Sequence, residues 1–262
     1  MTTPHAPPTY WRVLLASAVA TPGLVHEAYT RFHSYSLHNQ LLALSQCAER
    51  GITPGPLRTF QGWLSLGRAV RKGEKAIVLC TPFTKRQDDD EVIVGFCFRA
   101  RWFTLAQTDG QDYEEVALPS WREDRALSTL GIARVPFVAM NGNVQGYAQP
   151  GRQVAISPVA ALPHKTLFHE VAHIVLAHHE DAKTPRSVKE AEAEGVALLC
   201  CDALDLPGAD YARGYIQSWL RESEFTEESA QRVITTAQRI LAAGEEPSEG
   251  ESSDTVSPPV AA

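Results

Sequence analysis

The sequence predicts an α+β protein of two domains, a small α+β domain followed by a mostly helical domain that holds a short sheet. Apolar residues recur at helical spacing in much of the chain, whereas residues 76–81 and 92–104 alternate or run β-branched and aromatic, as strands do. The charge also changes along the chain. Residues 1–86 contain ten Lys or Arg and three Asp or Glu, whereas residues 87–262 contain fourteen and twenty-eight. We therefore expect a basic first domain and an acidic second one.

We place the first domain at residues 1–118 and the second at residues 119–243. Residues 244–262 are rich in Glu, Ser, Pro and Gly and contain hardly any large apolar group. Burial of so little apolar surface cannot offset the entropy lost on ordering, so this segment is expected to be a disordered tail.

Helical spacing and turn residues place the individual elements. In the first domain, helices are expected at residues 9–20 and 25–49, and Gly51 with the prolines after it ends the second of them. A polar turn at residues 85–91 joins the two strands into an antiparallel pair. The second domain is expected to contain strands at 135–138 and 153–156 and helices at 119–131, from 163 onward, at 184–201, 211–222 and 227–243.

An H-E-x-x-H motif lies in the second domain and consists of His169, Glu170 and His173. On an α-helix the two histidines share a face one turn apart, so that two ring nitrogens can bind a single zinc ion. Glu170 is rotated about a quarter-turn around the helix, and its carboxylate can reach a water bound to the metal. The alternative is a core helix with two solvated or hydrogen-bonded histidines, but the apolar residues on its other side favour a fixed, buried metal helix.

A zinc site of this kind needs a third protein ligand and one open position. In the helix at 184–201, Glu190 and Glu194 lie one turn apart on the same face, whereas Glu192 lies on the opposite side and would need a partner of its own. We expect Glu190 to be the ligand. Glu194 would accept a hydrogen bond from a ligating histidine and so fix the tautomer of that imidazole.

A structural interpretation of Glu190 competes with this assignment. Ser187 and Glu190 fit the S-x-x-E capping box, which would leave Glu194 as the metal ligand. Thr184 followed by Pro185 is the better helix start signal, and it favours Glu190 as the ligand.

The expected chemistry of this site is peptide hydrolysis. Zinc held by His169, His173 and Glu190 would lower the pKa of its bound water toward roughly 7 and polarise the scissile carbonyl. Glu170 would take the proton of the attacking water and return it to the leaving amine, as general base and then as general acid.

Two further features could bear on the substrate. The β-prone residues 153–156 precede the metal helix and could form an edge strand that pairs with an extended peptide, or an ordinary core strand. Tyr211, Tyr215 and His164 could polarise a substrate carbonyl, although such residues are more often structural.

The H-E-x-x-H helix and residues 190–199 resemble the ImmA/IrrE type of zinc peptidase, which in turn resembles the metalloprotease half of ArdC-type antirestriction proteins. The resemblance implies a zincin-like metallopeptidase domain in which the first acid of the second helix, Glu190, is the third ligand. Glu194 stands where these families usually have Asp or Asn. The residues after His173 look closer to the ImmA/IrrE branch.

Basic and aromatic residues are interleaved between residues 57 and 75 of the first domain. Proteins that bind single strands use this composition, with cations along the phosphates and rings stacked on the bases. It fits equally well a core of aromatic residues under a solvated basic face. Our candidates for nucleic-acid contacts are Arg58, Trp63, Arg68, Arg71, Lys72 and Lys75.

Four ordered segments give the first domain a more specific resemblance. Residues 35–42, 59–63, 67–75 and 107–110 are similar to successive motifs of the N-terminal ssDNA-binding domain of ArdC-type proteins, and the domain order is similar over residues 10–242. The resemblance implies single-stranded DNA as a partner and a role in antirestriction.

The sequence also limits where the protein acts. It opens without a basic region followed by a long apolar core, and its apolar runs fall far short of the roughly 20 residues of a membrane-spanning helix. The five cysteines form no C-x-x-C pair and fit reduced thiols. We therefore expect a cytoplasmic protein with no membrane partner.

Three functions are compatible with these features. The first is a zinc metallopeptidase tethered to ssDNA that cleaves a protein or peptide substrate. The second is a non-proteolytic ssDNA-binding protection protein, and the third is an ImmA-like protease that cleaves a regulatory protein. The open coordination position expected beside Glu170 favours a peptidase, because a structural zinc usually has four protein ligands.

Overall fold

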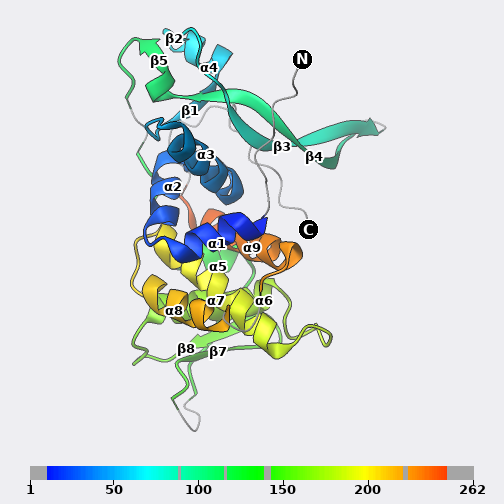
Figure 1. Cartoon of the computed structure of the whole chain (residues 1–262). Helices are drawn as coiled ribbons and strands as arrows, with labels where there is room; N and C mark the ends of the chain where they lie inside the picture. The colour runs from blue at the N-terminus through cyan, green and yellow to red at the C-terminus, as the bar shows by residue number, and fades with distance from the viewer. Residues whose placement is uncertain (1–10, 88–89, 115–116, 139–142, 221–223, 247–262) are drawn as a thin grey trace. The chain divides into compact units, whose positions relative to one another are not determined.

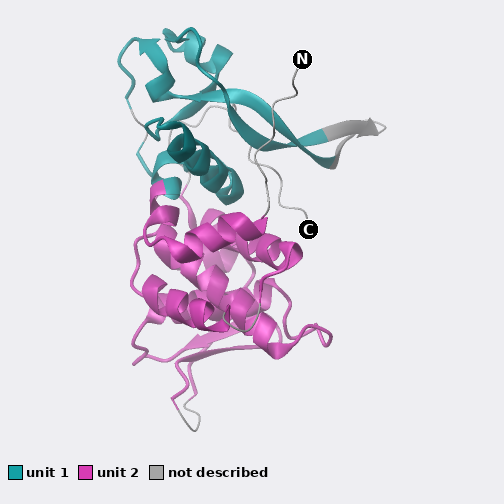
Figure 2. Cartoon of the chain, viewed as in Figure 1, with its two compact units in different colours: residues 1–9, 28–118, 251–262 teal, residues 10–27, 119–250 magenta. Residues whose placement is uncertain are grey.

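The computed structural model describes residues 11–87, 90–114, 117–138, 143–220 and 224–246. Figure 1 shows helices and three small sheets, and about half of the described residues are helical, which confirms the expected α+β class. Contacts divide the described residues into two compact units (Figure 2). Unit 1 contains residues 28–118, and unit 2 contains residues 11–27 and 119–246.

Unit 1 combines the end of α2 (Leu24–Phe32) and α3 (Leu37–Arg50) with two small sheets. The single helix expected at 25–49 was wrong, because Ser36 interrupts it and caps α3 by accepting a hydrogen bond from the backbone N–H of Asn39. Gly51 ends α3 in the left-handed region at φ 63°, as expected. The remaining elements are β1 (Leu57–Thr59), α4 (Phe60–Ser65), β2 (Arg68–Val70), β3 (Ile77–Gln87), β4 (Asp90–Thr104), the 3-10 helix η1 (Leu105–Gln107) and β5 (Thr108–Gly110).

The long hairpin β3–β4 dominates unit 1. The expected antiparallel pairing is confirmed, but the strands run further than predicted, from Ile77↔Trp102 to Gln87↔Asp90. β1 adds to the other side of β4, so the sheet order is β1-β4-β3, and β2 pairs with β5 in a second sheet. Residues 85–87 and 90–91 therefore belong to the strands and not to the expected turn at 85–91, while residues 88–89 lie outside the described residues.

Two amides of α3 cover the outer edge of β3. The Asn39 side chain accepts from the backbone N–H of Cys80 at 2.8 Å and donates to its carbonyl at 2.9 Å. Gln46 makes the same pair of hydrogen bonds with Val78 at 2.9 and 2.8 Å. Residues 39 and 46 lie two helical turns apart on one face of α3, while residues 78 and 80 direct their amides to the same side of the strand. The helix thus takes the place of a fourth strand.

Unit 2 is mostly helical, with one small sheet. Its elements are α1 (Trp11–Ala20), the start of α2, α5 (Glu123–Thr129), β6 (Ala133–Arg134), β7 (Gly146–Gln149), β8 (Gln153–Ile156), α6 (Pro163–Val175), α7 (Arg186–Ala203), α8 (Ala209–Trp219) and α9 (Glu227–Gly244). Most match the expected helices to within a few residues. Residues 135–138 are not a strand, since the pairing falls on Ala133 and Arg134 instead.

Residues 11–27 belong to unit 2, whereas the sequence places all of residues 1–118 in the first domain. Leu14, Leu15 and Val19 on α1 are buried, and α1 packs against α8 and α9. The buried Arg213 of α8 donates two hydrogen bonds of 2.6 Å to the last carbonyls of α1. Asp202 of α7 accepts hydrogen bonds from the first N–H groups around α2, at 3.1 and 3.0 Å. These contacts satisfy helix ends that otherwise lack partners.

Helix α7 is the centre of unit 2 and packs against α6, α8 and α9. Every residue from Ala191 to Ala203 is buried. Small residues permit this close packing: a Cβ added at Gly195 would lie 2.9 Å from a methyl carbon of Val233 on α9. The same buried stretch contains the carboxylates of Glu192, Glu194 and Asp202, each of which has a charged or hydrogen-bonding partner.

The sheet of unit 2 has the order β6-β8-β7, and α6 packs against β7 and β8 (Figure 1). The segment at 153–156 is therefore the central strand β8, which is buried from Val154 to Ile156. Of the two possibilities left open by the sequence, the core strand is the one observed. β7 is the edge strand that lies beside α6 within the described residues.

The other expectations concern cysteines, membranes and the tail. All five cysteines are free thiols, as predicted. No helix among the described residues is both long enough and apolar enough to cross a membrane. The expected disordered tail lies outside the described residues from position 247 onward, while α9 continues to Gly244.

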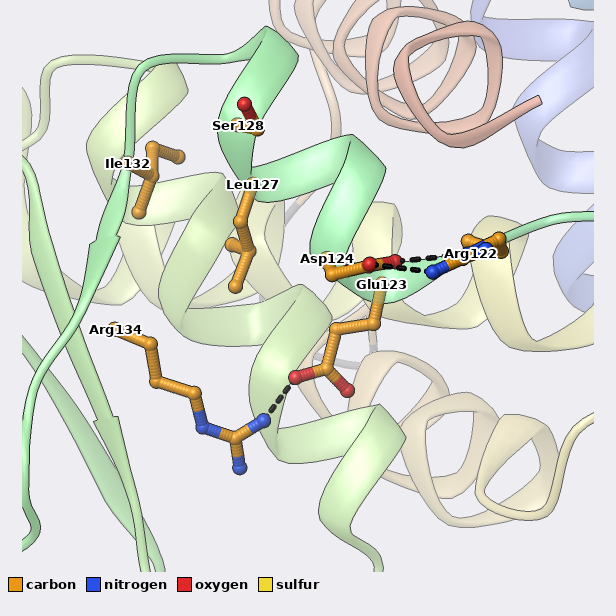
Figure 3. A pocket seen from close by; sticks show the side chains of 7 residues that line it. All are labelled: Arg122, Glu123, Asp124, Leu127, Ser128, Ile132 and Arg134. Carbon is orange, nitrogen blue, oxygen red and sulfur yellow. Dashed lines mark hydrogen bonds and ion pairs between the residues drawn. The ribbon is translucent and has the colours of Figure 1, made fainter. Parts of the chain in front are cut away.

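A shallow hollow of about 560 Å³ lies on unit 2 between α5 and β6 (Figure 3). The charged residues at its rim pair with one another, Arg134 with Glu123 and Arg122 with Asp124. None of the expected metal ligands lines it. The hollow is therefore separate from the expected metal ligands.

Candidate metal centre

Helix α6 fixes the H-E-x-x-H motif. Pro163 occupies its first turn, as predicted, and its apolar face is buried through Leu167, Phe168, Val171 and Ile174. Phe168 packs edge-on against Trp121, with ring centroids 5.3 Å apart. Because this side is held in the core, the opposite face presents the two imidazoles in defined positions.

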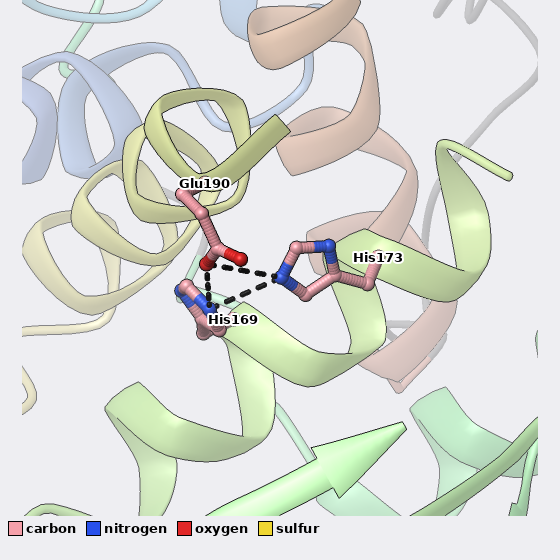
Figure 4. A group of neighbouring side chains, drawn as sticks. All are labelled: His169, His173 and Glu190. Carbon is pink, nitrogen blue, oxygen red and sulfur yellow. Dashed lines mark hydrogen bonds and ion pairs between the residues drawn. The ribbon is translucent and has the colours of Figure 1, made fainter. Parts of the chain in front are cut away.

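Three side chains from α6 and α7 converge at one point (Figure 4). The Nε2 atoms of His169 and His173 lie 3.1 Å apart. The Oε2 atom of Glu190 lies 3.4 Å from Nε2 of His169 and 3.6 Å from Nε2 of His173. Within the described residues, these three form the one group of His, Cys, Asp or Glu whose ligand atoms are close enough to share an ion.

The spacing of these atoms fits a bound cation. Three ligands at about 2.1 Å from a tetrahedral ion lie about 3.4 Å from one another, and the three observed distances, 3.1, 3.4 and 3.6 Å, lie around that value. Two imidazole nitrogens and a carboxylate oxygen are also a donor set that binds zinc and other divalent transition metals. The close contacts with His169, and then with His173, hold the pKa of Glu190 well below its usual value, so the carboxylate is ionised.

Glu194 lies behind His169, one turn along α7 from Glu190. Its Oε1 atom is 3.5 Å from Nδ1 of His169 and 2.5 Å from Nζ of Lys165. Lys165 also lies over the ring of Tyr211, with its Nζ atom 5.3 Å from the centroid. The structure therefore brings Glu190 to the Nε2 side of His169 and Glu194 to the Nδ1 side. Nδ1 of His169 has no hydrogen bond within the described residues, so the supporting role of Glu194 stays a prediction.

Glu192 does not join the cluster and instead has the separate partners that its burial demands. Its Oε2 atom lies 2.9 Å from Nε2 of His178 and 3.3 Å from Nη2 of Arg232, and Oε1 accepts a 2.6 Å hydrogen bond from Ser229. Burial alone would raise the pKa of Glu192, but the hydrogen bonds from His178 and Ser229 lower it overall. Burial lowers the pKa of His178.

Glu170, the expected general base, is held toward the sheet. Its Oε2 atom accepts a 2.9 Å hydrogen bond from the backbone N–H of Ala148 in β7. The N–H of Ser157 donates to the carbonyl of Gln145, and in an antiparallel pair the hydrogen-bonded positions alternate, so the amide of Ala148 points to the outer edge of β7. The side chain of Glu170 thus connects α6 to the edge strand β7.

The other residues considered for catalysis lie near the centre or at its periphery. Tyr215 on α8 is 41% exposed; partial burial and then the charges of Glu190 and Glu194 raise the pKa of its phenol. Tyr211 is 68% exposed and contacts Lys165. His164 is half-buried in the first turn of α6.

The six candidates for nucleic-acid contacts divide into structural and exposed residues. Trp63 is fully buried, donates a 2.8 Å hydrogen bond to the carbonyl of Phe103 and packs edge-on against Tyr113. The sequence prediction was wrong for this ring, because a buried indole cannot stack on a base. Arg58 reaches the hydroxyl of Tyr113 at 3.4 Å and lies 6.0 Å from its ring centroid.

The two arginines of the β2 region also have protein partners. Arg68 donates to Thr108 through Nε at 2.9 Å and joins β2 to β5. Arg71 pairs with Glu74 at 2.8 Å and with Asp109 at 3.5 Å. Lys72 and Lys75 are exposed.

Exposed rings outside the six candidates lie on the hairpin and on α4. Phe96 is 61% exposed and Phe98 38%, and they share a face of β4 because they are two residues apart. Phe60 on α4 is 48% exposed. Successive residues of β4 lie on opposite faces of the strand. The sequence alone does not show which of these faces is covered, so it could not identify the exposed rings. The unit as a whole is also less basic than expected, since residues 28–118 contain eleven Lys or Arg and ten Asp or Glu.

Fold and site together define an α+β protein in which one unit holds a potential cation site between two packed helices. Residues 14–124 match the family described as the N-terminal domain of anti-restriction factor ArdC. This confirms the resemblance for that part of the chain. The assignment of an ImmA/IrrE-type peptidase domain stays a prediction.

Two solved structures of the antirestriction protein ArdC from the R388 plasmid are similar to the chain. The Mn(II)-bound structure is 20% identical, covers 89% of this chain and 96% of its own, and has a TM-score of 0.56. The metal-free structure is also 20% identical, with 89% and 94% covered and a TM-score of 0.52. At this identity the likeness shows a shared fold. The comparison with curated proteins gives no match.

Proposed function

We propose that this protein is a divalent-metal peptidase, with zinc as the expected ion, joined to a unit that binds single-stranded DNA. Its role would be antirestriction or protection of incoming DNA. The observation that carries the peptidase is the convergence of His169, His173 and Glu190, with the glutamate of the H-E-x-x-H motif next to them on α6.

The donor set supports cation binding at this centre. Two neutral imidazoles and one carboxylate leave positions open for water and substrate, whereas a structural zinc usually has four protein ligands. The similar ArdC structure with Mn(II) is in keeping with a divalent ion in this fold. A bound ion would supply Lewis acidity, polarising a carbonyl and acidifying a water.

The chain's own residues would then perform the proton transfers. Glu170 is held by a single main-chain hydrogen bond from Ala148, so it can exchange that partner for a water. It would accept the proton as the water attacks the scissile carbonyl and deliver it to the leaving amine. Lys165 and Glu194 would hold His169 in place from behind, since their 2.5 Å ion pair is nearly buried.

The outer edge of β7 is the surface that suits an extended peptide. A strand that adds to this edge forms main-chain hydrogen bonds with it, including one to the N–H of Ala148. Substrate binding would therefore displace Glu170 from Ala148 and release its carboxylate for the reaction. This assigns to β7 the role that the sequence had suggested for residues 153–156.

The support for DNA binding comes from unit 1. The match of residues 14–124 to the N-terminal domain of ArdC supports an antirestriction role. Exposed cations, Lys72 and Lys75, and the exposed rings Phe96 and Phe98 provide the two kinds of contact that single strands use. Because the net charge of the unit is near zero, attraction to phosphates alone would be weak. The proposal therefore depends equally on stacking of the exposed rings on the bases.

The decisive experiment compares the wild type with Glu170→Gln and His173→Ala. Metal content, cleavage of an unfolded protein and of the chain itself, and retention on ssDNA are measured for each. We expect the wild type to bind one ion and to cleave, Glu170→Gln to keep the ion without cleaving, and His173→Ala to lose the ion. All three should bind ssDNA and release it with increasing salt.

Each outcome distinguishes the proposal from its alternatives. ssDNA binding by a protein that never cleaves, with or without metal, would support a protection protein. Cleavage by a protein that is not retained on ssDNA would favour a protease of a regulatory protein. Undiminished cleavage by Glu170→Gln would exclude the assigned general base.

A further inference from the structure

A buried chain of hydrogen bonds lies behind His173, on the side away from Glu190. Nδ1 of His173 lies 2.8 Å from Nδ1 of His178, and Nε2 of His178 lies 2.9 Å from Oε2 of Glu192. The second oxygen of Glu192 accepts from Ser229 at 2.6 Å. His178 and Glu192 are 4% and 2% exposed, so water does not compete for these contacts.

The turn after α6 explains how His178 reaches this position. The N–H of His178 bonds the carbonyl of His173 at 3.0 Å, and the N–H of Ala177 bonds the carbonyl of Ile174 at 3.2 Å. Ala177 has φ 55°, in the left-handed region. These are the bonds of a Schellman motif, in which the side chains of the first and last bonded residues usually touch. Here the touching pair is His173 and His178.

The partners of Glu192 determine which atom donates in each hydrogen bond between Glu192, His178 and His173. Arg232 carries only donors and lies 3.3 Å from the same oxygen that faces His178, so this oxygen is an acceptor. A neutral His178 must then hold its one proton on Nε2 and offer a lone pair at Nδ1. His173 can bond that lone pair only by holding its own proton on Nδ1. This leaves Nε2 of His173 unprotonated, where it faces Glu190 and His169.

We propose that His178 and Glu192 are positioning residues that hold His173 in its Nδ1–H tautomer and so prepare Nε2 to bind a cation. Neither side chain would contact the cation itself. The two ligating histidines therefore have different supports, Glu194 for His169 and a histidine–carboxylate pair for His173. This inference rests on the proposed cation binding.

The test measures tautomer and metal affinity separately in the full-length chain. Nitrogen-15 NMR of the metal-free wild type should show His173 protonated at Nδ1. His178→Phe removes the acceptor and should abolish this preference and weaken Zn²⁺ or Mn²⁺ binding by about 10- to 100-fold. His178→Asn offers its amide oxygen near the former Nδ1 and should restore most of both.

Ser229→Ala is the matched control. It removes a hydrogen bond from the same buried carboxylate but leaves the contact between Glu192 and His178, so the tautomer of His173 should not change. A wild type with His173 protonated at Nε2, or a His178→Phe variant with unchanged tautomer and affinity, would overturn the inference. The wild-type measurement decides the question even where His178→Phe does not fold.

The results also separate this inference from the proposed function. A wild type that shows the Nδ1–H tautomer but binds no divalent ion would contradict the metal centre while leaving the hydrogen-bond chain intact. A wild type that binds the ion and shows the other tautomer would contradict only the role of His178 and Glu192.

Discussion

Glu190 and Glu194, one turn apart on α7, approach the two opposite nitrogens of the same imidazole. Oε2 of Glu190 lies 3.4 Å from Nε2 of His169, and Oε1 of Glu194 lies 3.5 Å from Nδ1. Glu190 also reaches His173, whereas Glu194 pairs with Lys165. Two acids of the same type on the same face of a helix therefore have different partners.

This relationship predicts different effects of the same substitution. Glu194→Gln should weaken divalent-metal binding by about 10- to 100-fold, as loss of a supporting partner does. Glu190→Gln should weaken it more, because the substitution removes an anionic ligand. Calorimetric titration with Zn²⁺ and with Mn²⁺ measures both. A larger loss for Glu194→Gln would reverse the assignment and make Glu194 the ligand.

The edge strand β7 provides the second prediction. Because the N–H of Ala148 points outward, Ala148→Pro removes a hydrogen-bond donor without breaking the pairing with β8. We expect the fold and the metal to be retained and kcat/KM for a peptide to fall about tenfold, the value of one hydrogen bond.

Gln149→Pro is the contrasting variant, since Gln149 pairs with Gln153 and its amide points toward β8. It should lower stability, as measured by thermal unfolding, through loss of a ladder hydrogen bond. Unchanged peptide kinetics in Ala148→Pro would show that the substrate does not bind along β7.

The third prediction separates the structural residues of unit 1 from those proposed to bind DNA. Trp63→Phe removes the indole donor to the carbonyl of Phe103 and part of a fully buried side chain, and it should cost about 1–3 kcal/mol of stability, with ssDNA affinity unchanged. The double variant Lys72→Gln/Lys75→Gln should keep its stability. It should also reduce the slope of log affinity against log salt by about 0.7 for each phosphate that the variant no longer neutralises.

Urea unfolding and ssDNA binding at several salt concentrations provide the two readouts. Weakened ssDNA binding by folded Trp63→Phe would restore Trp63 as a contact residue. An unaltered salt slope in the double variant would remove the two lysines from the interface.

The sequence predicted the convergence of His169, His173 and Glu190 more accurately than the positions of the residues proposed to contact DNA. A helix of known period converts the spacing of His169, His173 and Glu190 directly into positions, so the three could be placed before any fold was known. No such period relates Trp63 to a surface. An interleaved pattern of rings and cations fits a core and a binding face equally well, and only packing decided that Trp63 is buried.

Several features depended on tertiary contacts that no local pattern carries. Helix α1 joins unit 2 because Arg213, nearly two hundred residues later, bonds its last carbonyls. The break between α2 and α3 needed a single cap, Ser36, which ordinary helical periodicity conceals. His178 was overlooked because Ala177, rather than glycine, occupies the left-handed position that signals the turn.

The last prediction concerns pH and unit 1. His38 is 6% exposed on α3, and burial lowers its pKa to about 4 from a usual value of 6.5. Since the folded-state pKa lies below that of the unfolded chain, the unfolded chain binds more protons between these values. Stability from the neutral His38 is therefore fully present above pH 6.5 and declines as the pH falls toward 4, by up to about 3 kcal/mol. His38→Phe removes this titration, so urea-unfolding free energies of the variant should fall less between pH 7 and pH 4 than those of the wild type. Parallel pH profiles of the two proteins would show that His38 is not held neutral by burial.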